Sequence, residues 1–164
     1  LYLDFRDVQL RILSKMAETI IKEMEAFRSA LKEAGLAATR QRLQLAEIIF
    51  STHQHFTADD LYEWTRKKGW NIGRVTAYRT LKLMVDAHLV EERHFRRDRV
   101  VYEHVFGHDH HDHMVCTSCD TIIEFESPAI EKEQNRIARK HGFETTSHSH
   151  TLKGHCKKCT SRKK

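Results

Sequence analysis

Two C-x-x-C pairs near the end of the sequence constrain the fold of this chain more than any other feature. The pairs are Cys116/Cys119 and Cys156/Cys159, which accounts for all four cysteines. Each pair can present two thiolates from one turn, and structural zinc binds four Cys or His ligands in tetrahedral geometry. The 36 residues between Cys119 and Cys156 exceed the roughly 15–20 of a compact zinc ribbon, so the intervening segment must fold back. We therefore predict a four-cysteine zinc site that clamps the C-terminal tail onto the sheet of a small domain.

A C-x-x-C pair can also be a redox motif, or simply two free surface thiols. Disulfides are disfavoured in a reducing cytosol, where paired thiols more often bind metal. A thioredoxin-like redox motif lies in a βαβ pattern, which neither pair shows. The residues therefore favour metal binding over redox chemistry.

Histidine is concentrated in the same part of the chain. Nine of the 13 histidines lie between positions 104 and 155. The run H-H-D-H occupies positions 110–113, and successive side chains on a strand point to opposite faces. His111 and His113 would therefore share one face, while His110 and Asp112 would share the other.

Each of these two sets needs further ligands from elsewhere in the chain. The candidates are Glu103, Glu124, Glu131, His55 and His148. Mixed histidine and carboxylate sets suit Fe²⁺, Mn²⁺, Zn²⁺ or Co²⁺ and lack the soft thiolate character of a four-cysteine site. From periodicity alone, a solvated histidine-rich turn with adventitious metal affinity is an open alternative.

The composition indicates a folded chain that leans toward helix. Hydrophobic residues make up 40% and charged residues 31%, with only six glycines and one proline. No apolar run approaches the roughly 20 residues that cross a bilayer, and no signal-peptide pattern opens the sequence. We expect a cytoplasmic protein with no membrane partner. The net charge of +5 is compatible with nucleic-acid binding, but many unrelated proteins share it.

The first half of the chain shows helical periodicity. Apolar residues recur at helical spacing from about 5 to 34, and Gly35 fits a C-terminal cap. Thr39 and Thr57 can cap two further helices, and a fourth is predicted from 74 to about 87. The apolar pattern does not locate any break within the first helix.

The period then changes to that of strands. Two strands are predicted at 89–95 and 99–103, joined by a charged turn at 96–98. Short helices followed by a β-hairpin are the layout of a winged helix-turn-helix. A hinge at 105–109 would end this first domain, which covers 1–104.

A second α+β domain is predicted over 110–164. Strands are expected at 113–116, 121–125 and 143–152. Pro128 is placed as an early-turn proline of a helix that ends near Gly142. The predicted fold class is therefore α+β, with a winged helix followed by a small α/β domain.

Several motifs from about residue 30 to 160 resemble the ferric uptake regulator (Fur) family. They are T-x-Q-R at 39–42, H-F-T-A-D-D-L-Y at 55–62, I-G-R-V-T-A-Y-R-T-L at 72–81, H-H-D-H-M-V-C-x-x-C from 110, I-I-E-F, K-H-G-F, S-H-S and G-H-C. The resemblance implies a metal-responsive transcriptional repressor of metal uptake genes, not an enzyme. It implies a homodimer or tetramer on double-stranded operator DNA, with 110–164 as the dimerisation domain and no small-molecule substrate.

The resemblance also implies three metal sites. The structural zinc would be held by Cys116, Cys119, Cys156 and Cys159. The regulatory metal would be held by His55, Glu103, His111, His113 and Glu124. The additional site would be held by His110, Asp112, Glu131 and His148. The last two sets match the two faces of the histidine strand.

Glutamates at 103 and 124 resemble the iron-responsive branch, because peroxide-sensing relatives usually carry aspartates there. Fe²⁺ is therefore the expected regulatory metal, with Mn²⁺, Zn²⁺ or Co²⁺ as substitutes. Peroxide-, zinc- or manganese-responsive regulators are the alternatives, since ligand type constrains the metal only loosely. A metalloenzyme lacks a nucleophile or general-base motif beside the ligands, and a zinc-buffering protein would leave the winged-helix pattern unexplained.

The expected DNA contacts lie on the fourth helix and on nearby arginines. They are Arg74, Thr76, Tyr78, Arg79, Arg40 and Arg42, with Arg96, Arg97 and Arg99 in the wing. Arginine can bond guanine O6 and N7, and the first turns of a recognition helix enter the major groove. Ala37 stands where many relatives carry a lysine that reaches the minor groove, so that contact is not expected from this position.

Overall fold

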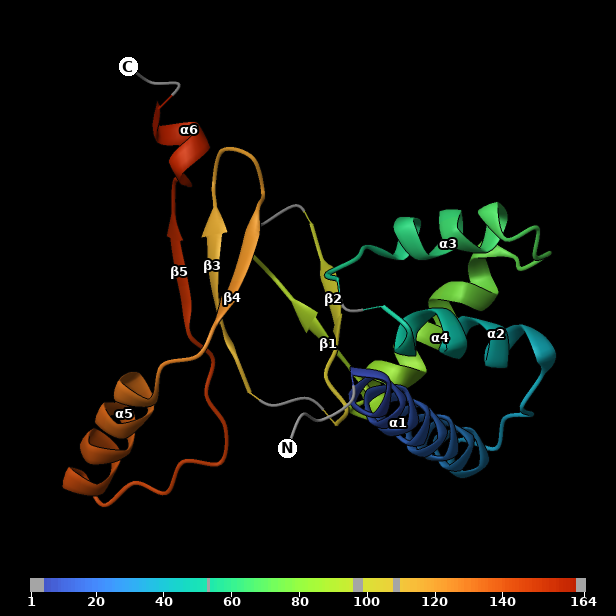
Figure 1. The fold of residues 1–164 in the computed structure, drawn as a ribbon, viewed down its shortest axis with the longest axis horizontal. Coiled ribbons are helices and arrows are strands. Elements are labelled where there is room, and N and C mark those ends of the chain that lie inside the picture. The colour runs from blue at the N-terminus through green and yellow to red at the C-terminus, as the bar shows by residue number, and fades with distance from the viewer. Residues whose placement is uncertain (1–4, 53, 96–98, 108–109, 162–164) are drawn as a thin grey trace. The chain divides into compact units, whose positions relative to one another are not determined.

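The chain folds as two compact units, residues 1–108 and 109–164 (Figure 1). The computed structural model describes residues 5–52, 54–95, 99–107 and 110–161. The first unit is mainly helical and the second is built on a small sheet, which confirms the predicted α+β class. Within the described residues, no helix combines the length and the apolar character needed to span a membrane.

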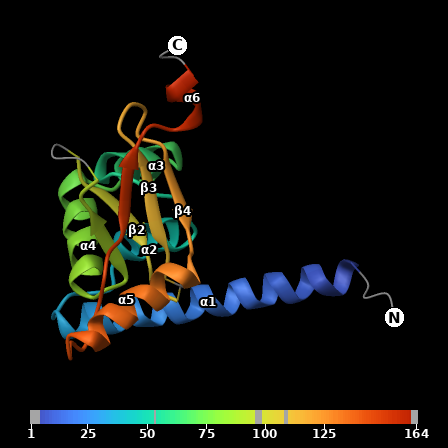
Figure 2. The same ribbon diagram turned by 90° about the vertical axis from the view of Figure 1, so that its left-hand side faces the viewer.

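Over its described residues, the first unit consists of four helices and a two-stranded hairpin. Its elements are α1 (Phe5–Glu33), α2 (Arg40–Phe50), α3 (Ala58–Lys67), α4 (Arg74–Asp86), β1 (Val90–Arg93) and β2 (Val101–His104). Helix α1 is continuous along its whole length (Figure 2). The hairpin strands are shorter than predicted, and the turn predicted at 96–98 lies outside the described residues.

The helix ends follow from the capping residues. The Thr39 hydroxyl accepts a hydrogen bond from the backbone N–H of Arg42. Thr57 and Asp60 form a reciprocal capping box at the start of α3. Gly35 ends α1 with a φ of +66°, a conformation that glycine adopts without steric cost. These predicted caps are confirmed.

The four helices bury one apolar core. Its fully buried side chains include Phe27, Leu31, Leu45, Ile49, Leu61, Leu81 and Met84. Each such side chain contributes about 1.5–3 kcal/mol when it leaves water. Because Ala77 and Leu81 turn toward this core, Tyr78 and Val75 lie on the opposite side of α4, where both are exposed. Core packing thus decides which face of α4 is presented to solvent.

The second unit is a three-stranded sheet with a crossover helix. Its elements are β3 (Asp112–Cys116), β4 (Ile122–Phe125), α5 (Pro128–Lys140), β5 (Thr151–Gly154) and α6 (Lys157–Ser161). The strand order is β4-β3-β5, with β4 antiparallel and β5 parallel to the central β3. Pro128 opens α5, as predicted.

The strand predicted at 143–152 is wrong over most of its length. Pairing with β3 begins at Thr151, opposite His113, and continues to Gly154. Among the described residues, 143–150 have no neighbouring strand to pair with along their length, and Phe143 is 67% exposed. Residues 143–150 therefore show the sequence pattern of a strand but do not form one, because no described strand is paired with them. Helix α6 was not predicted.

A buried polar pair joins α1 to the hairpin. Glu23 Oε1 lies 3.3 Å from His104 Nε2, and only 2% of each side chain is exposed. The His104 ring also lies 5.0 Å from the ring of Phe50. Burial raises the pKa of Glu23 from 4.5 to about 7. This polar contact therefore attaches the N-terminal helix to the hairpin, while Phe27 and Leu31 pack in the core.

Replacing Glu23 with Gln tests this pair. The raised pKa means that the folded protein keeps a proton which the unfolded chain releases above pH 4.5. The contribution of Glu23 to the free energy of unfolding therefore falls as pH rises from about 4.5 to 7, by up to about 3 kcal/mol. We expect Glu23→Gln to gain stability relative to wild type over that window in urea unfolding.

Glu25→Gln, on an exposed position of the same helix, is the control and should track the wild type at every pH. A Glu23→Gln variant whose stability followed the wild-type pH profile would contradict the assignment.

Candidate metal centres

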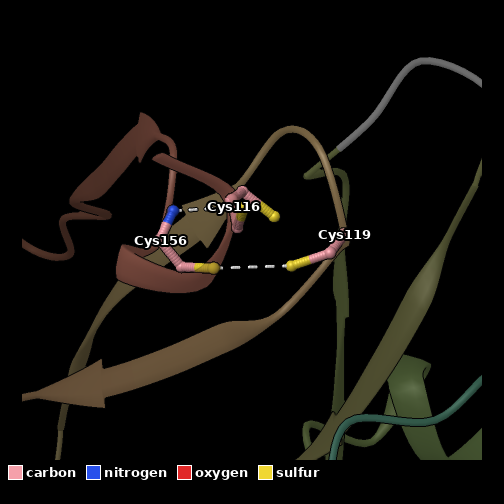
Figure 3. Close-up of side chains that lie close together, drawn as sticks. Cys116, Cys119 and Cys156 are labelled. Carbon is pink, nitrogen blue, oxygen red and sulfur yellow. Dashed lines mark hydrogen bonds between the residues drawn. The ribbon is translucent and has the colours of Figure 1, made fainter. Parts of the chain in front are cut away.

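The four cysteines meet at one end of the sheet. Cys116 is the last residue of β3 and Cys119 lies in the turn before β4, while Cys156 and Cys159 follow β5. Their sulfur atoms all lie within 4.8 Å of one another, and Cys119 Sγ is 3.6 Å from Cys156 Sγ (Figure 3). Zinc bonds of about 2.3 Å in a tetrahedron place sulfurs about 3.8 Å apart. The set therefore fits a tetrahedral ion of the size of zinc.

Hydrogen bonds hold this end of the sheet in place. The backbone N–H of Thr117 donates to the carbonyl of Gly154 at 2.8 Å, which ties the first cysteine turn to β5. The backbone N–H of Cys156 donates to Cys116 Sγ at 3.3 Å (Figure 3). His155 Nδ1 lies 2.9 Å from Ser118 Oγ. The chain's own hydrogen bonds therefore define the shape of this turn.

The thiols have unequal proton affinities. Hydrogen bonds from the backbone N–H groups of Cys156 and Ser118 lower the pKa of Cys116 to about 5. The hydrogen bond with the Cys119 sulfur raises the pKa of Cys159 to about 12. A hydrogen bond with the Thr121 hydroxyl also lowers the pKa of Cys119. The cluster therefore favours thiolates at Cys116 and Cys119 and a protonated thiol at Cys159, and a divalent cation would balance the charge of further thiolates.

A second cluster lies at the opposite end of the sheet, beside α5. His110 Nε2 lies 3.3 Å from Asp112 Oδ1, and His148 Nε2 lies 3.1 Å from Glu131 Oε1. One ligand atom from each of the four residues lies within 4.8 Å of the others. Asp112 Oδ1 is buried and accepts no well-aligned hydrogen bond from the described residues. A buried carboxylate oxygen in this state is costly, and a bound cation would satisfy it.

The residues expected at the regulatory site fall into two sets, one in each unit. In the first unit, the hydrogen-bonded pair Phe56 and Tyr102 brings the preceding His55 beside the following Glu103. His55 Nε2 lies 3.5 Å from Glu103 Oε2. The isolated bridge between Phe56 and Tyr102 therefore positions His55 next to Glu103, although the two residues are far apart in sequence.

The second unit holds the other set on β3 and β4. The rings of His111 and His113 are 5.0 Å apart, and His113 is paired across the sheet with Glu124. His111 Nε2 lies 3.9 Å from Glu124 Oε2. His110, in contrast, lies 3.3 Å from Asp112 Oδ1 and 3.9 Å from Glu131 Oε1 of α5. The two histidine sets therefore separate by alternate positions along the segment, although the strand itself begins only at Asp112.

The residues of α4 that are expected to contact DNA differ in their exposure and in their contacts within the protein. Tyr78 and Arg79 are exposed, and Tyr78 OH lies 3.5 Å from Asp59 Oδ1. Arg74 Nη1 is 3.1 Å from the same carboxylate, and its guanidinium lies over the Tyr62 ring. Thr76 is only partly exposed, and its backbone carbonyl accepts a hydrogen bond from Thr80.

The other arginines expected to contact DNA also differ in whether their side chains are engaged within the protein. Arg42 Nη1 donates to the carbonyl of Ala37 at 2.6 Å, so this side chain is engaged within the protein. Arg40 and Arg99 are exposed, whereas Arg96 and Arg97 lie outside the described residues. The sequence did not single out Arg93, which contacts Glu103. The sequence signal for Arg93 was its place two residues after Glu91 in a predicted strand, which puts both side chains on one face of the hairpin.

The sequence profile of the ferric uptake regulator family matches residues 33–153. The chain belongs to this family. The ferric uptake regulation protein of Campylobacter jejuni is 38% identical over 142 residues, which cover 85% of this chain and 90% of the relative. Fur-family proteins are transcriptional regulators, so this chain is a metal-dependent regulator and not an enzyme.

Two solved Fur structures share the fold. The Vibrio cholerae ferric uptake regulator is 40% identical and covers 78% of this chain and 98% of its own, with a TM-score of 0.67. The Helicobacter pylori regulator is 27% identical and covers 87% and 94%, with a TM-score of 0.79. Its structure is described as revealing three functional metal binding sites.

Substituting Cys119 with Ser tests the cysteine cluster. The variant should lose one tightly held zinc per chain and unfold at a lower temperature, because the metal would no longer link the C-terminal cysteines to the β3–β4 turn. Zinc remaining after dialysis against a weak chelator, together with the thermal midpoint, measures both effects. Ser161→Ala on exposed α6 is the control and should change neither. Full zinc retention by Cys119→Ser would exclude the four-cysteine site.

Proposed function

We propose that this chain is a metal-dependent DNA-binding repressor of metal uptake genes, with Fe²⁺ as its regulatory metal in the cell. The observation that carries the proposal is the division of one ligand set between the two units. His55 and Glu103 lie side by side in the first unit, and His111 and His113 lie side by side in the second. His55 and Glu103 alone are too few ligands for a metal site, and His111, His113 and Glu124 of the second unit are the further candidate ligands.

A regulatory metal that drew ligands from both sets would supply coordinate bonds that favour one arrangement of the two units. The residues of each set are already positioned by strand pairing, so each unit contributes ligands with little local rearrangement. Moving an equilibrium from 1:99 to 99:1 takes about 5.5 kcal/mol of differential affinity, which several coordinate bonds can provide. In this proposal, the arrangement favoured by metal is the one that binds the operator.

Helix α4 is proposed to read the operator. Ala77 and Leu81 fix its inner face in the core, which leaves Tyr78 and Arg79 exposed together. Arg79 can bond guanine O6 and N7, and Tyr78 can contact a thymine methyl group or a phosphate. Arg74 is a phosphate contact in this proposal, although Asp59 and Tyr62 also engage it.

A second copy of the chain is proposed to cover one face of the sheet. Met114 of β3 is paired with Ile123 of β4 on one side and with Leu152 of β5 on the other. These three adjacent side chains are 37–48% exposed and form an apolar row across all three strands. Helix α5 likewise buries none of its residues. Exposed apolar rows of this kind mark protein interfaces, which supports a homodimer.

The cysteine cluster is proposed to hold structural zinc and the cluster beside α5 to hold the additional metal. Three ligand groups agree in number with the three functional metal binding sites described for the Helicobacter pylori relative. Glu103 and Glu124 support Fe²⁺ in the regulatory position, with Mn²⁺, Zn²⁺ or Co²⁺ as substitutes. A zinc- or manganese-responsive regulator with the same architecture is the alternative.

Operator binding should depend on both halves of the regulatory set. With zinc bound to the cysteines, Mn²⁺ should tighten wild-type binding to operator DNA at least about ten-fold in fluorescence anisotropy. His55→Ala and His113→Ala should each remove this response, because each deletes a ligand from one unit. His94→Ala, on an exposed histidine of the hairpin, should respond like wild type. Identical wild-type affinity with and without metal would refute the mechanism.

Arg79→Ala separates DNA recognition from metal binding. The variant should lose roughly 1–3 kcal/mol of operator affinity with its metal content unchanged, because it removes a base contact. Arg66→Ala removes the same charge from exposed α3 and should change affinity much less. An unchanged operator footprint with Arg79→Ala would show that α4 does not read the DNA.

A further inference from the structure

Two carboxylates face each other across the hairpin. Glu91 of β1 is paired directly with Glu103 of β2. Like charges in this position destabilise a strand pair unless a counter-charge is present. Arg93 lies two residues after Glu91 on β1 and therefore points to the same face of the hairpin.

The Arg93 guanidinium bridges these carboxylates. Its Nε donates to Glu103 Oε2 at 2.9 Å, and its Nη2 lies 2.9 Å from Glu91 Oε2. The Arg93 side chain is 19% exposed and that of Glu103 is 7% exposed. A charge-assisted hydrogen bond shielded from water is among the stronger polar interactions in a protein. The Glu91 carboxylate is far more open, with 45% of its side chain exposed.

The oxygen that Arg93 holds is also the one that faces His55. Glu103 Oε2 lies 2.9 Å from Arg93 Nε and 3.5 Å from His55 Nε2. A metal bonded to both His55 and Glu103 would place two positive charges within a few ångströms of the guanidinium. The cation must therefore displace Arg93 from Glu103 or bind against its repulsion.

We propose that Arg93 is an internal competitor of the regulatory metal, which holds Glu103 in the metal-free protein and thereby sets the metal concentration needed for a response. The inference rests on the proposed role of His55 and Glu103 as regulatory ligands. Glu91 completes the device, because it offers the guanidinium a second carboxylate when the metal takes the first. Arg93 would thus lose Glu103 but keep Glu91, which it already contacts, and would not be left unpaired.

A purely structural role for Arg93 makes the opposite prediction. If the guanidinium only relieved repulsion between Glu91 and Glu103, its removal would loosen the hairpin and weaken metal binding. If it competes with the metal, its removal leaves Glu103 available and strengthens metal binding. The sign of the change in metal affinity therefore distinguishes the two roles.

The test is Arg93→Met in the full-length, zinc-loaded protein, which removes the charge and keeps an apolar stem. We expect Mn²⁺ to bind the regulatory site at least about ten-fold more tightly than in wild type, equivalent to about 1.4 kcal/mol. Free Mn²⁺ measured by electron paramagnetic resonance during titration reports this without DNA. Arg66→Met, which removes a charge from exposed α3, should match wild type.

Unchanged or weaker Mn²⁺ binding by Arg93→Met would overturn the inference. If that variant does not fold, the double substitution Glu91→Gln with Arg93→Gln removes the repulsion together with the competitor. The double variant should also bind Mn²⁺ more tightly than wild type, and unchanged affinity there would equally overturn the inference. Glu103→Gln identifies the site: it should weaken Mn²⁺ binding in wild type. If it does not, the proposed regulatory site fails as well.

Discussion

The central strand β3 is the constraint on which the second unit depends. It is hydrogen-bonded on both sides, to β4 and to β5, so the direction of each side chain along it is fixed. Successive positions must point to opposite faces, and His113 and Asp112 are therefore assigned to different ligand groups by backbone geometry alone. The strand then ends at Cys116, where the turn supplies the thiols. One short segment contributes to three groups of candidate ligands because a strand has two faces and an end.

The sequence was informative wherever a local rule decides the structure. Thr39, Thr57 and Pro128 marked helix starts through hydrogen bonds and ring geometry that need only a few neighbouring residues. The alternation in H-H-D-H anticipated which histidines lie together, because period-two geometry does not depend on the rest of the fold. The same rule misled at 143–150, where a strand-like pattern lacks a strand beside it. Pairing is a tertiary property that a single segment does not encode.

Contacts between segments distant in sequence were also not predicted. Nothing near Glu23 in sequence announces that it meets His104, since the contact depends on how α1 packs on the hairpin. Arg93 was equally hard to single out among 28 basic residues, because its importance comes from the register that sets Glu91 opposite Glu103. The candidate ligands that lie close together in the structure were named from the sequence, whereas the arginine that contacts one of them was not.

The strand β2 has a consequence for how this family can diversify. Glu103 and His104 are consecutive, so one faces the ligand pair while the other faces α1. A buried histidine at 104 is suited to a chain whose first helix brings a carboxylate to it. A relative with a shorter beginning would have no such carboxylate, and an apolar side chain would fit that position better. Positions 23 and 104 should therefore change together during evolution, independently of the adjacent Glu103.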